Sequence, residues 1–213
     1  MANDMQANIL RHALVLFAKD GFEGVSMRNI AAAADTKLPL IYHYFPDKQA
    51  LYDAAVHEAF SYMTERMLHA AHSRASGKAR LRAFLQKLVE LQASSTPEVR
   101  LVDRELLEAR PETMMKLGPD LFQRPHDALV EIIRNLSPAA PAQEIAEHLI
   151  AVTYGAVKLR TVRAQLKGLK RLREVAGIAD SVTAFAFAAI DAMGGTDDGT
   201  QQAATSAEPL PVS

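Results

Sequence analysis

A tyrosine-rich run followed by a lysine is the part of this sequence whose residue types suggest a specific chemistry. Tyr42, His43 and Tyr44 stand together, and Lys48 follows four residues later, after a Pro-Asp pair. Tyrosine hydroxyl groups donate to phosphate oxygens, and a lysine in the first helical turn joins free backbone N–H groups that also bind anions. This chemistry suits a nucleic-acid backbone. The alternative interpretation is that both tyrosines are core aromatics and Lys48 is a solvated charge.

The residues around this run predict two short helices joined by a tight turn. Ser26 is a typical N-cap for a helix over residues 27–34, which contains four consecutive alanines, the best helix formers. Asp35 suits the turn because aspartate tolerates the left-handed backbone conformation. Pro39 fits the first turn of the second helix, and Asp47 is placed to cap the next. This pattern predicts a helix-turn-helix, whose second helix lies in the DNA major groove.

Residues 5–52 resemble the DNA-binding domain of the TetR family of bacterial transcriptional regulators. The matching stretches are ILRHALVLFAKDGF, the serine at 26, NIAAAA and, most specifically, IYHYFPDKQALY. The sequence departs from the family pattern at the turn, where Asp35 replaces the usual glycine. It departs again in the second helix, where Lys37 replaces a frequent Ser or Thr cap and Leu38 replaces a common polar or basic residue. These differences affect the preferred bases rather than the fold.

The motif and the resemblance together predict a set of DNA contacts. Arg28 can bond a guanine edge through two N–H groups, and Lys37 can reach a base edge as a point charge. Pro39 and Leu40 offer apolar contacts to thymine methyl groups. The full set is Ser26, Arg28, Lys37, Leu38, Pro39, Leu40, Tyr42, His43, Tyr44 and Lys48.

Composition limits the classes of protein that this chain can be. The 213 residues carry a net charge of −1, with five basic and five acidic side chains in residues 1–50. DNA binding must therefore depend on where the charges lie. The absence of cysteine excludes disulfides and Cys-containing zinc sites. Residues 1–10 lack the features of a signal peptide, and no uninterrupted apolar run has the length of a membrane helix, so we expect a cytoplasmic protein without a membrane partner.

The whole chain is expected to be all-α, with an N-terminal three-helix helix-turn-helix domain followed by a helical bundle. The predicted divisions are a DNA-binding domain at 1–47, an effector-binding and dimerisation domain at 48–193, and a disordered tail at 194–213. A Gly-Pro-Asp turn at 118–120 is expected to separate two helices. The predicted helices of the bundle are 48–72, 79–94, 97–111, 121–136, 141–166 and one capped by Asp180 that ends at Met193.

Large flexible and aromatic side chains are frequent in the middle helices. Methionine adapts to irregular shapes, and the family resemblance implies that this domain encloses a ligand. Simple core filling is the alternative explanation. Arg104, His126 and Tyr154 are the candidates to orient a largely apolar ligand, and the basic run 158–173 leaves room for an anionic group, although a solvated helix end is favoured for that run. The predicted ligand residues are Phe60, Met63, Met67, Phe84, Leu88, Arg104, Leu107, Met115, Phe122, His126 and Tyr154.

Small residues four apart occur in the last two long helices, namely Ala151 and Gly155, then Ala184 and Ala188. Such spacing lets two helices approach closely. The resemblance implies a homodimer through these helices.

The functional prediction is a ligand-responsive transcriptional regulator, a repressor that binds a palindromic double-stranded DNA operator as a homodimer and is released by a small, largely apolar effector. We expect no enzymatic activity, no cofactor and no metal. One alternative is a helical metal-binding protein or enzyme built on four side chains of one predicted helix, although no second cluster completes the ligand set. Another is a constitutive DNA-binding protein without an effector. The four side chains are His57, Glu58, His69 and His72.

Overall fold

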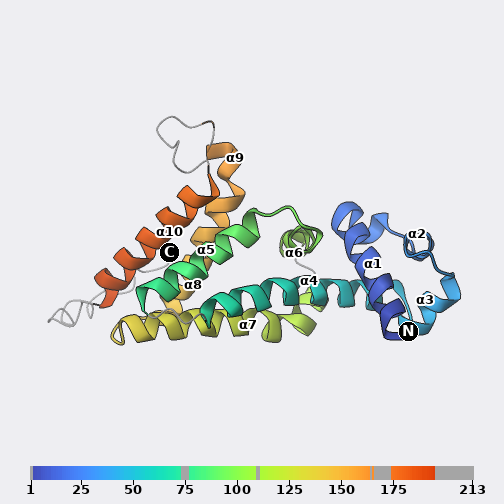
Figure 1. Ribbon diagram of the computed structural model, residues 1–213, viewed down its shortest axis with the longest axis horizontal. Coiled ribbons are helices and arrows are strands. Elements are labelled where there is room, and N and C mark those ends of the chain that lie inside the picture. The colour runs from blue at the N-terminus through green and yellow to red at the C-terminus, as the bar shows by residue number, and fades with distance from the viewer. Residues whose placement is uncertain (1, 73–76, 109–110, 164, 166–173, 195–213) are drawn as a thin grey trace, which may run out of the picture.

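The computed structural model describes residues 2–72, 77–108, 111–163, 165 and 174–194, and these residues form helices and connecting turns without a strand. Figure 1 shows three of the helices grouped at one end of an elongated molecule: α1 (Ala2–Gly24), α2 (Met27–Ala33) and α3 (Leu38–Tyr44). The all-α prediction is confirmed. The other helices are α4 (Lys48–Ala71), α5 (Lys78–Ala93), α6 (Pro97–Glu108), α7 (Pro111–Leu136), α8 (Ala142–Lys158), α9 (Arg160–Arg163) and α10 (Val175–Gly194).

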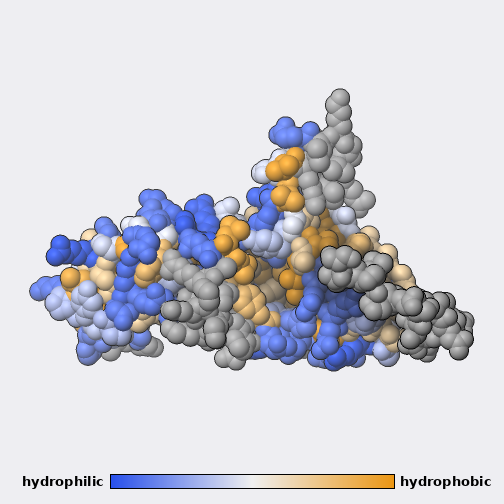
Figure 2. All heavy atoms as spheres, turned by 180° about the vertical axis from the view of Figure 1, so that it is seen from behind, coloured by the Kyte–Doolittle hydropathy of each residue, from blue (hydrophilic) through white to orange (hydrophobic). Residues whose placement is uncertain are grey.

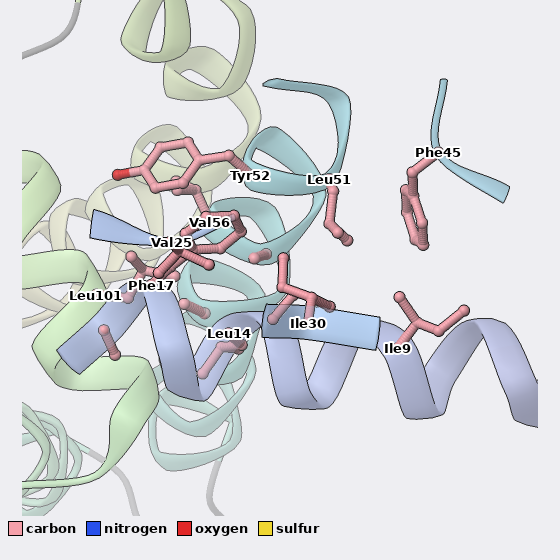
Figure 3. Packing of buried hydrophobic residues seen from close by; sticks show 14 of the residues in the cluster. Ile9, Leu14, Phe17, Val25, Ile30, Phe45, Leu51, Tyr52, Val56 and Leu101 are labelled. Atoms are coloured by element: carbon pink, nitrogen blue, oxygen red, sulfur yellow. The ribbon is translucent and has the colours of Figure 1, made fainter. Parts of the chain in front are cut away.

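One hydrophobic core joins α1, α2 and α3 to α4 and α6. Phe17 of α1, Tyr52 of α4 and Leu101 of α6 are fully buried in it, and Figure 3 shows these side chains converging. The Phe17 and Tyr52 rings meet edge to face with their centroids 5.0 Å apart. The core around α1, α2 and α3 therefore continues past residue 47 into the helices that follow.

A second core lies between α5, α7, α8 and α10. Leu85, Ile133, Leu149 and Ile178 are fully or almost fully buried there, one from each helix. Helix α4 is long enough to contact both groups of helices, and Figure 1 shows it running from α1 along α7. Because α4 begins at Lys48, directly after the helix-turn-helix, it connects the two ends of the molecule mechanically.

Gly21 marks the place where α6 meets α1. Its φ of 74° interrupts the helical backbone near the end of α1, in the left-handed conformation for which glycine is favoured at helix ends. A Cβ atom at this position would lie 2.9 Å from Nη1 of Arg104, so a larger residue would collide with the guanidinium group. Arg104 also donates to the Lys19 carbonyl oxygen at 3.3 Å, which fastens α6 to the end of α1.

The predicted break at 118–120 is wrong, because α7 runs without interruption from Pro111 to Leu136. Proline and glycine disfavour a helix locally, but packing of a long apolar face routinely overrides such local preferences. The face that α7 lays along α4 and α8 supplies this packing. Pro125, near the start of the predicted helix at 121–136, lies in the second half of α7 and is buried.

Two other helix boundaries also differ from the prediction. Helix α8 ends at Lys158 instead of near residue 166, and the short α9 follows it. Helix α10 begins at Val175, so Asp180 lies inside the helix and does not cap it. Residues 166–173 and the tail at 195–213 lie outside the described part of the structure.

Helix α10 is long and apolar enough to cross a membrane by length and composition alone. In the structure it packs against α5 and α8, and Ile178, Val182 and Ile190 are buried in the second core. That packing is typical of a core helix of a globular protein.

Candidate nucleic-acid interface and apolar cavity

Local hydrogen bonds fix the start of α2. The Ser26 hydroxyl accepts from the Asn29 backbone N–H at 3.1 Å, and the Asn29 side chain accepts from the Ser26 backbone N–H at 3.0 Å. This reciprocal pair is a capping box, in which asparagine takes the place of the usual Glu or Gln. The predicted N-cap role of Ser26 is confirmed, and Asn29 is a partner that the sequence reasoning missed.

The turn between α2 and α3 has the predicted geometry. Asp35 has a φ of 49°, the left-handed conformation expected at this position. Lys37 is the N-cap of α3 but makes no side-chain capping bond, and Pro39 lies in the first turn. Ile41 anchors α3 because its side chain is fully buried in the first core. The turn and this anchor set the angle at which α3 presents its other faces to solvent.

The outer face of α3 carries three of the ten predicted DNA contacts. Pro39, Tyr42 and His43 are exposed, and Tyr42 retains 48% of its accessible surface. The alternative that Tyr42 is a core aromatic therefore fails. Tyr44 is half-buried, packs against the first core and meets the His43 ring at 5.1 Å, so it is partly a core residue.

The remaining predicted contacts lie beside this face. Arg28 on α2 and Lys37 before α3 are exposed, whereas Leu38 and Leu40 are half-buried. Leu38 packs against the first core, which leaves only part of its side chain for an outside contact. The structure brings part of the predicted set around one surface hollow whose lining includes Ser26, Arg28, Leu38, Tyr42 and Lys48.

Lys48 lies at the start of α4, on the rim of this hollow. Asp47 caps the helix as predicted, because its carboxylate accepts from the Ala50 backbone N–H at 2.7 Å. The Lys48 ammonium group lies 4.3 Å from the centroid of the Phe22 ring. This cation–π contact was missed from the sequence, and it offsets part of the unfavourable interaction between a lysine and a helix N-terminus.

An apolar cavity of about 480 Å³ lies between α4, α5, α6, α7 and α8. Its volume is within the range of roughly 300–1,000 Å³ that is usual for small-molecule sites. Eight of the predicted ligand residues line it: Phe60, Met63, Met67, Phe84, Leu88, Leu107, Phe122 and Tyr154.

Several lining residues were not predicted. Glu147, Ile150, Ala151 and Tyr154 are spaced at i, i+3, i+4 and i+7, so that face of α8 could have been found by periodicity. Gln92 stands among the buried leucines of α5, where a polar residue is itself a signal. The unpredicted lining residues are Thr64, Gln92, Val102, Leu106, Pro125, Glu147, Ile150 and Ala151.

Two of the three polar ligand candidates lie away from the cavity. Arg104 bonds the Lys19 carbonyl oxygen and, at 3.2 Å, the Glu108 carboxylate, so it serves the contact between α1 and α6. His126 is half-buried beside Asp127 and does not line the cavity. The side chain of Met115 lies outside the described part of the structure.

Polar groups in the cavity lining are few. Gln92 is 8% exposed, and its Oε1 atom has no hydrogen-bond partner among the described residues. Burial, with a smaller contribution from the nearby Asp103 carboxylate, raises the pKa of Tyr154 above its usual value, which keeps the phenol neutral. Of the described lining residues, Glu147 is the only one with an ionisable carboxylate, and none is basic.

The small residues of α8 and α10 lie at the surface. Ala151, Ala184 and Ala188 are exposed, and a Cβ built on Gly155 would have no atom within 4 Å. Large apolar side chains are exposed on the same two helices and on α9, which stands at the top of Figure 1. Figure 2 shows apolar surface on the corresponding arm and in the middle of the molecule. The exposed side chains are Val152, Leu159, Val162 and Phe185.

The histidines proposed for an alternative metal site are spread along α4. His57, His69 and His72 are exposed, and His72 Nδ1 bonds the Leu68 carbonyl oxygen at 2.7 Å. Across the part of the chain that the structure describes, no group of three His, Cys, Asp or Glu side chains is arranged to hold a metal ion.

A capped α2, a left-handed turn at Asp35 and an α3 with an exposed polar face define a helix-turn-helix protein. Residues 9–55 match the model of the family described as bacterial regulatory proteins, tetR family. The chain thus carries a TetR-family DNA-binding domain, and the resemblance seen in its sequence is confirmed.

A curated relative and two solved structures extend this comparison. The negative transcriptional regulator IcaR of the biofilm operon icaADBC, from Staphylococcus aureus (strain Newman), is 29% identical over 59 residues, which are 28% of this chain and 32% of the relative. The match thus spans about a third of that relative's length. A Saccharomonospora viridis protein in complex with choline has a TM-score of 0.68 at 21% identity, covering 86% of this chain and 95% of that one. AibR, in complex with isovaleryl coenzyme A and operator DNA, has a TM-score of 0.64 at 23% identity, covering 85% and 97%. These structural likenesses show a shared fold.

Proposed function

We propose that this protein is a cytoplasmic, ligand-responsive transcriptional repressor that binds a palindromic DNA operator as a homodimer and is released by a small, largely apolar effector. The exposed face of α3 and the hollow beside it support DNA binding. IcaR, which resembles the N-terminal region, is described as a negative regulator, and this supports repression. The bound molecules in the choline complex and in the AibR complex support a ligand site within this fold.

The observation that carries the proposal is that the same helices form the cavity and hold the helix-turn-helix. Helix α4 starts at Lys48 beside the DNA-binding surface, and four of its side chains line the cavity further along: Phe60, Met63, Thr64 and Met67. A molecule that fills the cavity therefore contacts the helix whose first turn adjoins the recognition helix.

Helix α6 forms a second connection between the two sites. Val102 and Leu106 line the cavity, whereas Arg104 bonds the end of α1. The buried Glu105 carboxyl accepts from the Tyr52 hydroxyl at 2.6 Å, which joins α6 to α4. A ligand that shifts α6 thus displaces two helices of the DNA-binding end. The ligand can do so only to the extent that it binds the shifted state more tightly.

The exposed apolar face of α8 and α10 supports a homodimer. A monomer would leave Val152, Phe185 and the small residues around them in water, and large exposed apolar patches usually mark interfaces. A two-fold dimer would place two copies of α3 in successive major grooves, about 34–36 Å apart. Operator binding would then require an inverted repeat.

Selection of binding sites from random double-stranded DNA tests the proposal. We expect the purified protein to enrich an inverted repeat whose half-sites lie about one helical turn apart. Enrichment of no palindrome would contradict it. With the selected DNA in hand, release by an effector can be titrated, and a hundredfold loss of DNA affinity corresponds to close to 3 kcal/mol of coupling between the sites. A protein that binds the repeat but responds to no ligand would be a constitutive DNA-binding protein.

A further inference from the structure

The electrostatic character of the cavity differs from that expected of a site for anions. Glu147 lies on the exposed edge of α8 and is the only charged side chain among the described lining residues. Two described bases near Gln92, Lys158 and Arg160, make hydrogen bonds within the protein. Lys158 donates to the Gln92 backbone carbonyl oxygen at 3.0 Å and to the Asp103 carboxylate at 2.5 Å. Arg160 donates to a backbone carbonyl group at the end of α5. An anionic ligand would therefore meet a carboxylate without a compensating cation among the lining residues that the structure describes.

The buried end of the cavity favours a hydrogen-bond donor. The Gln92 amide oxygen is buried and has no partner among the described residues, and a buried acceptor without a donor is unfavourable. Tyr154 lies at the same end of the cavity. The Lys158 ammonium group bonds the Gln92 backbone carbonyl oxygen and lies 5.5 Å from the centroid of the Tyr154 ring. The phenol remains neutral and adds no charge. A ligand group that donates to Gln92 would satisfy the acceptor.

The two polar positions are separated by apolar surface. Glu147 and Tyr154 are seven residues apart on one face of α8, which is about 10 Å along a helix. Aromatic and methionine side chains from the facing helices line the space between, including the Phe60 and Phe122 rings, which meet edge to face at 4.9 Å. Aromatic rings also attract organic cations.

We propose that the cavity takes an elongated, largely apolar amine, with its ammonium group beside Glu147 and a hydroxyl or similar donor on the Gln92 amide oxygen. This inference rests on the proposed function, because it names the chemical class of the effector. It makes no use of the basic run at 158–173, for which a solvated helix end was the favoured interpretation.

Four small probes that differ by one feature each test this pattern. The reference probe, 4-(4-hydroxyphenyl)butylamine, carries both the ammonium group and the donor. The compound 4-phenylbutylamine lacks the donor, 4-(4-hydroxyphenyl)butan-1-ol lacks the charge, and 4-(4-hydroxyphenyl)butanoate reverses it. Calorimetry on the full chain should find the reference probe bound most tightly and the carboxylate most weakly. We expect the alcohol to bind up to about fivefold more weakly than the reference, as for one partly exposed charge pair. We expect the loss of the donor to weaken binding by about tenfold.

Two variants assign each preference to its residue. Glu147→Gln should remove the preference for the amine over the alcohol and keep the preference for the hydroxyl group. Gln92→Met, which preserves side-chain length, should do the opposite. Glu144→Gln is the matched control, because Glu144 is exposed in the first turn of α8 and does not line the cavity. All three proteins are compared only after circular dichroism shows unchanged helical content and thermal midpoint. If Gln92→Met fails this check, the conservative Gln92→Glu, which keeps an acceptor and adds charge, should strengthen amine binding.

Three results would overturn the inference. These are a carboxylate probe that binds as tightly as the amine, a Glu147→Gln protein that keeps the amine preference, and no binding by any probe. DNA binding by the same preparation is measured separately on the selected operator. If the protein binds the operator but does not rank the four probes as expected, only the amine inference is refuted. If it ranks the probes as expected but does not bind the operator, the proposed regulatory function is refuted.

Discussion

The core beneath the helix-turn-helix is closed, whereas the helices that follow it leave a cavity of about 480 Å³ between them. In the first region, Ile9, Phe17 and Ile30 have no exposed surface, and caps at Ser26 and Asp47 fix the starts of α2 and α4. In the second, long helices hold an interior lined by aromatic and methionine side chains. The difference indicates that the position of α3 depends on tight packing, while the cavity keeps volume for a ligand.

The largest expected effect comes from truncating a phenylalanine in each region. Phe17→Ala should cost about 3–5 kcal/mol of unfolding free energy, because it leaves a cavity in a closed core. Phe122 is 40% exposed, borders an existing cavity and contacts the Phe60 ring, so Phe122→Ala should cost only about 1 kcal/mol. Urea denaturation of both variants measures the difference. Equal losses of stability would show that the cavity is filled or collapsed in solution.

Gly155→Leu sharpens the comparison at the exposed face of the second region. A Cβ built at this position has no atom of the same protomer within 4 Å, so the substitution should leave the fold of the single chain unchanged. At a close helix–helix interface the added side chain should cost about 1–3 kcal/mol of association free energy by overpacking. Sedimentation should show dissociation at lower dilution than for the wild type. Glu131→Leu, on the exposed surface of α7, is the control for an added leucine outside the predicted interface. A wild-type protein that is monomeric at micromolar concentration would contradict the dimer itself.

Local signals explain why the helix-turn-helix could be predicted closely from sequence. Ser26, Asp35 and Asp47 act through hydrogen bonds or backbone preferences within four residues of their own position, and all three have the predicted roles. The contact between Lys48 and Phe22 could not be found in this way, because it depends on how α1 and α4 pack.

Long-range packing explains the errors in the second region. The Gly-Pro-Asp sequence at 118–120 has the composition of a turn, yet it lies inside α7. Arg104 was expected in the cavity as a polar group that would orient a ligand, but its guanidinium group serves the contact with α1 across 85 positions of the chain. The apolar side chains Phe60, Met63 and Met67 of α4 were predicted to contact a ligand, and they line the cavity. Helical periodicity groups Glu147, Ile150, Ala151 and Tyr154 on one face of α8, but the orientation of that face towards the cavity depends on how α8 packs.

The contact between Tyr52 and Glu105 tests the boundary between the two regions. Tyr52→Phe removes the donor to a fully buried carboxyl group while keeping the ring, so it should cost about 1–2 kcal/mol of stability. Tyr42→Phe is the control, because Tyr42 is exposed. A double-mutant cycle with Glu105→Gln isolates the pair from the rest of the core. If the pair also transmits the effector signal, Tyr52→Phe should reduce the change in DNA affinity caused by the ligand. Full retention of that change would show that α4 alone connects the sites.

The smallest effect is expected from Lys48, at the outer surface of the closed region. Lys48→Met keeps an apolar stem over the Phe22 ring but removes the charge, so stability should fall by at most about 1 kcal/mol. If Lys48 bonds a DNA phosphate, affinity should fall alike for all sequences, and the dependence of affinity on salt should weaken by about one phosphate contact. Arg28→Ala is the informative contrast, because loss of a base contact should relax the preference at one position of the selected site. Binding titrations at several salt concentrations separate these outcomes. An unchanged salt slope for Lys48→Met, together with its loss of stability, would assign Lys48 to the contact with Phe22 and leave the anchoring of DNA to Arg28, Lys37 and the tyrosines of α3.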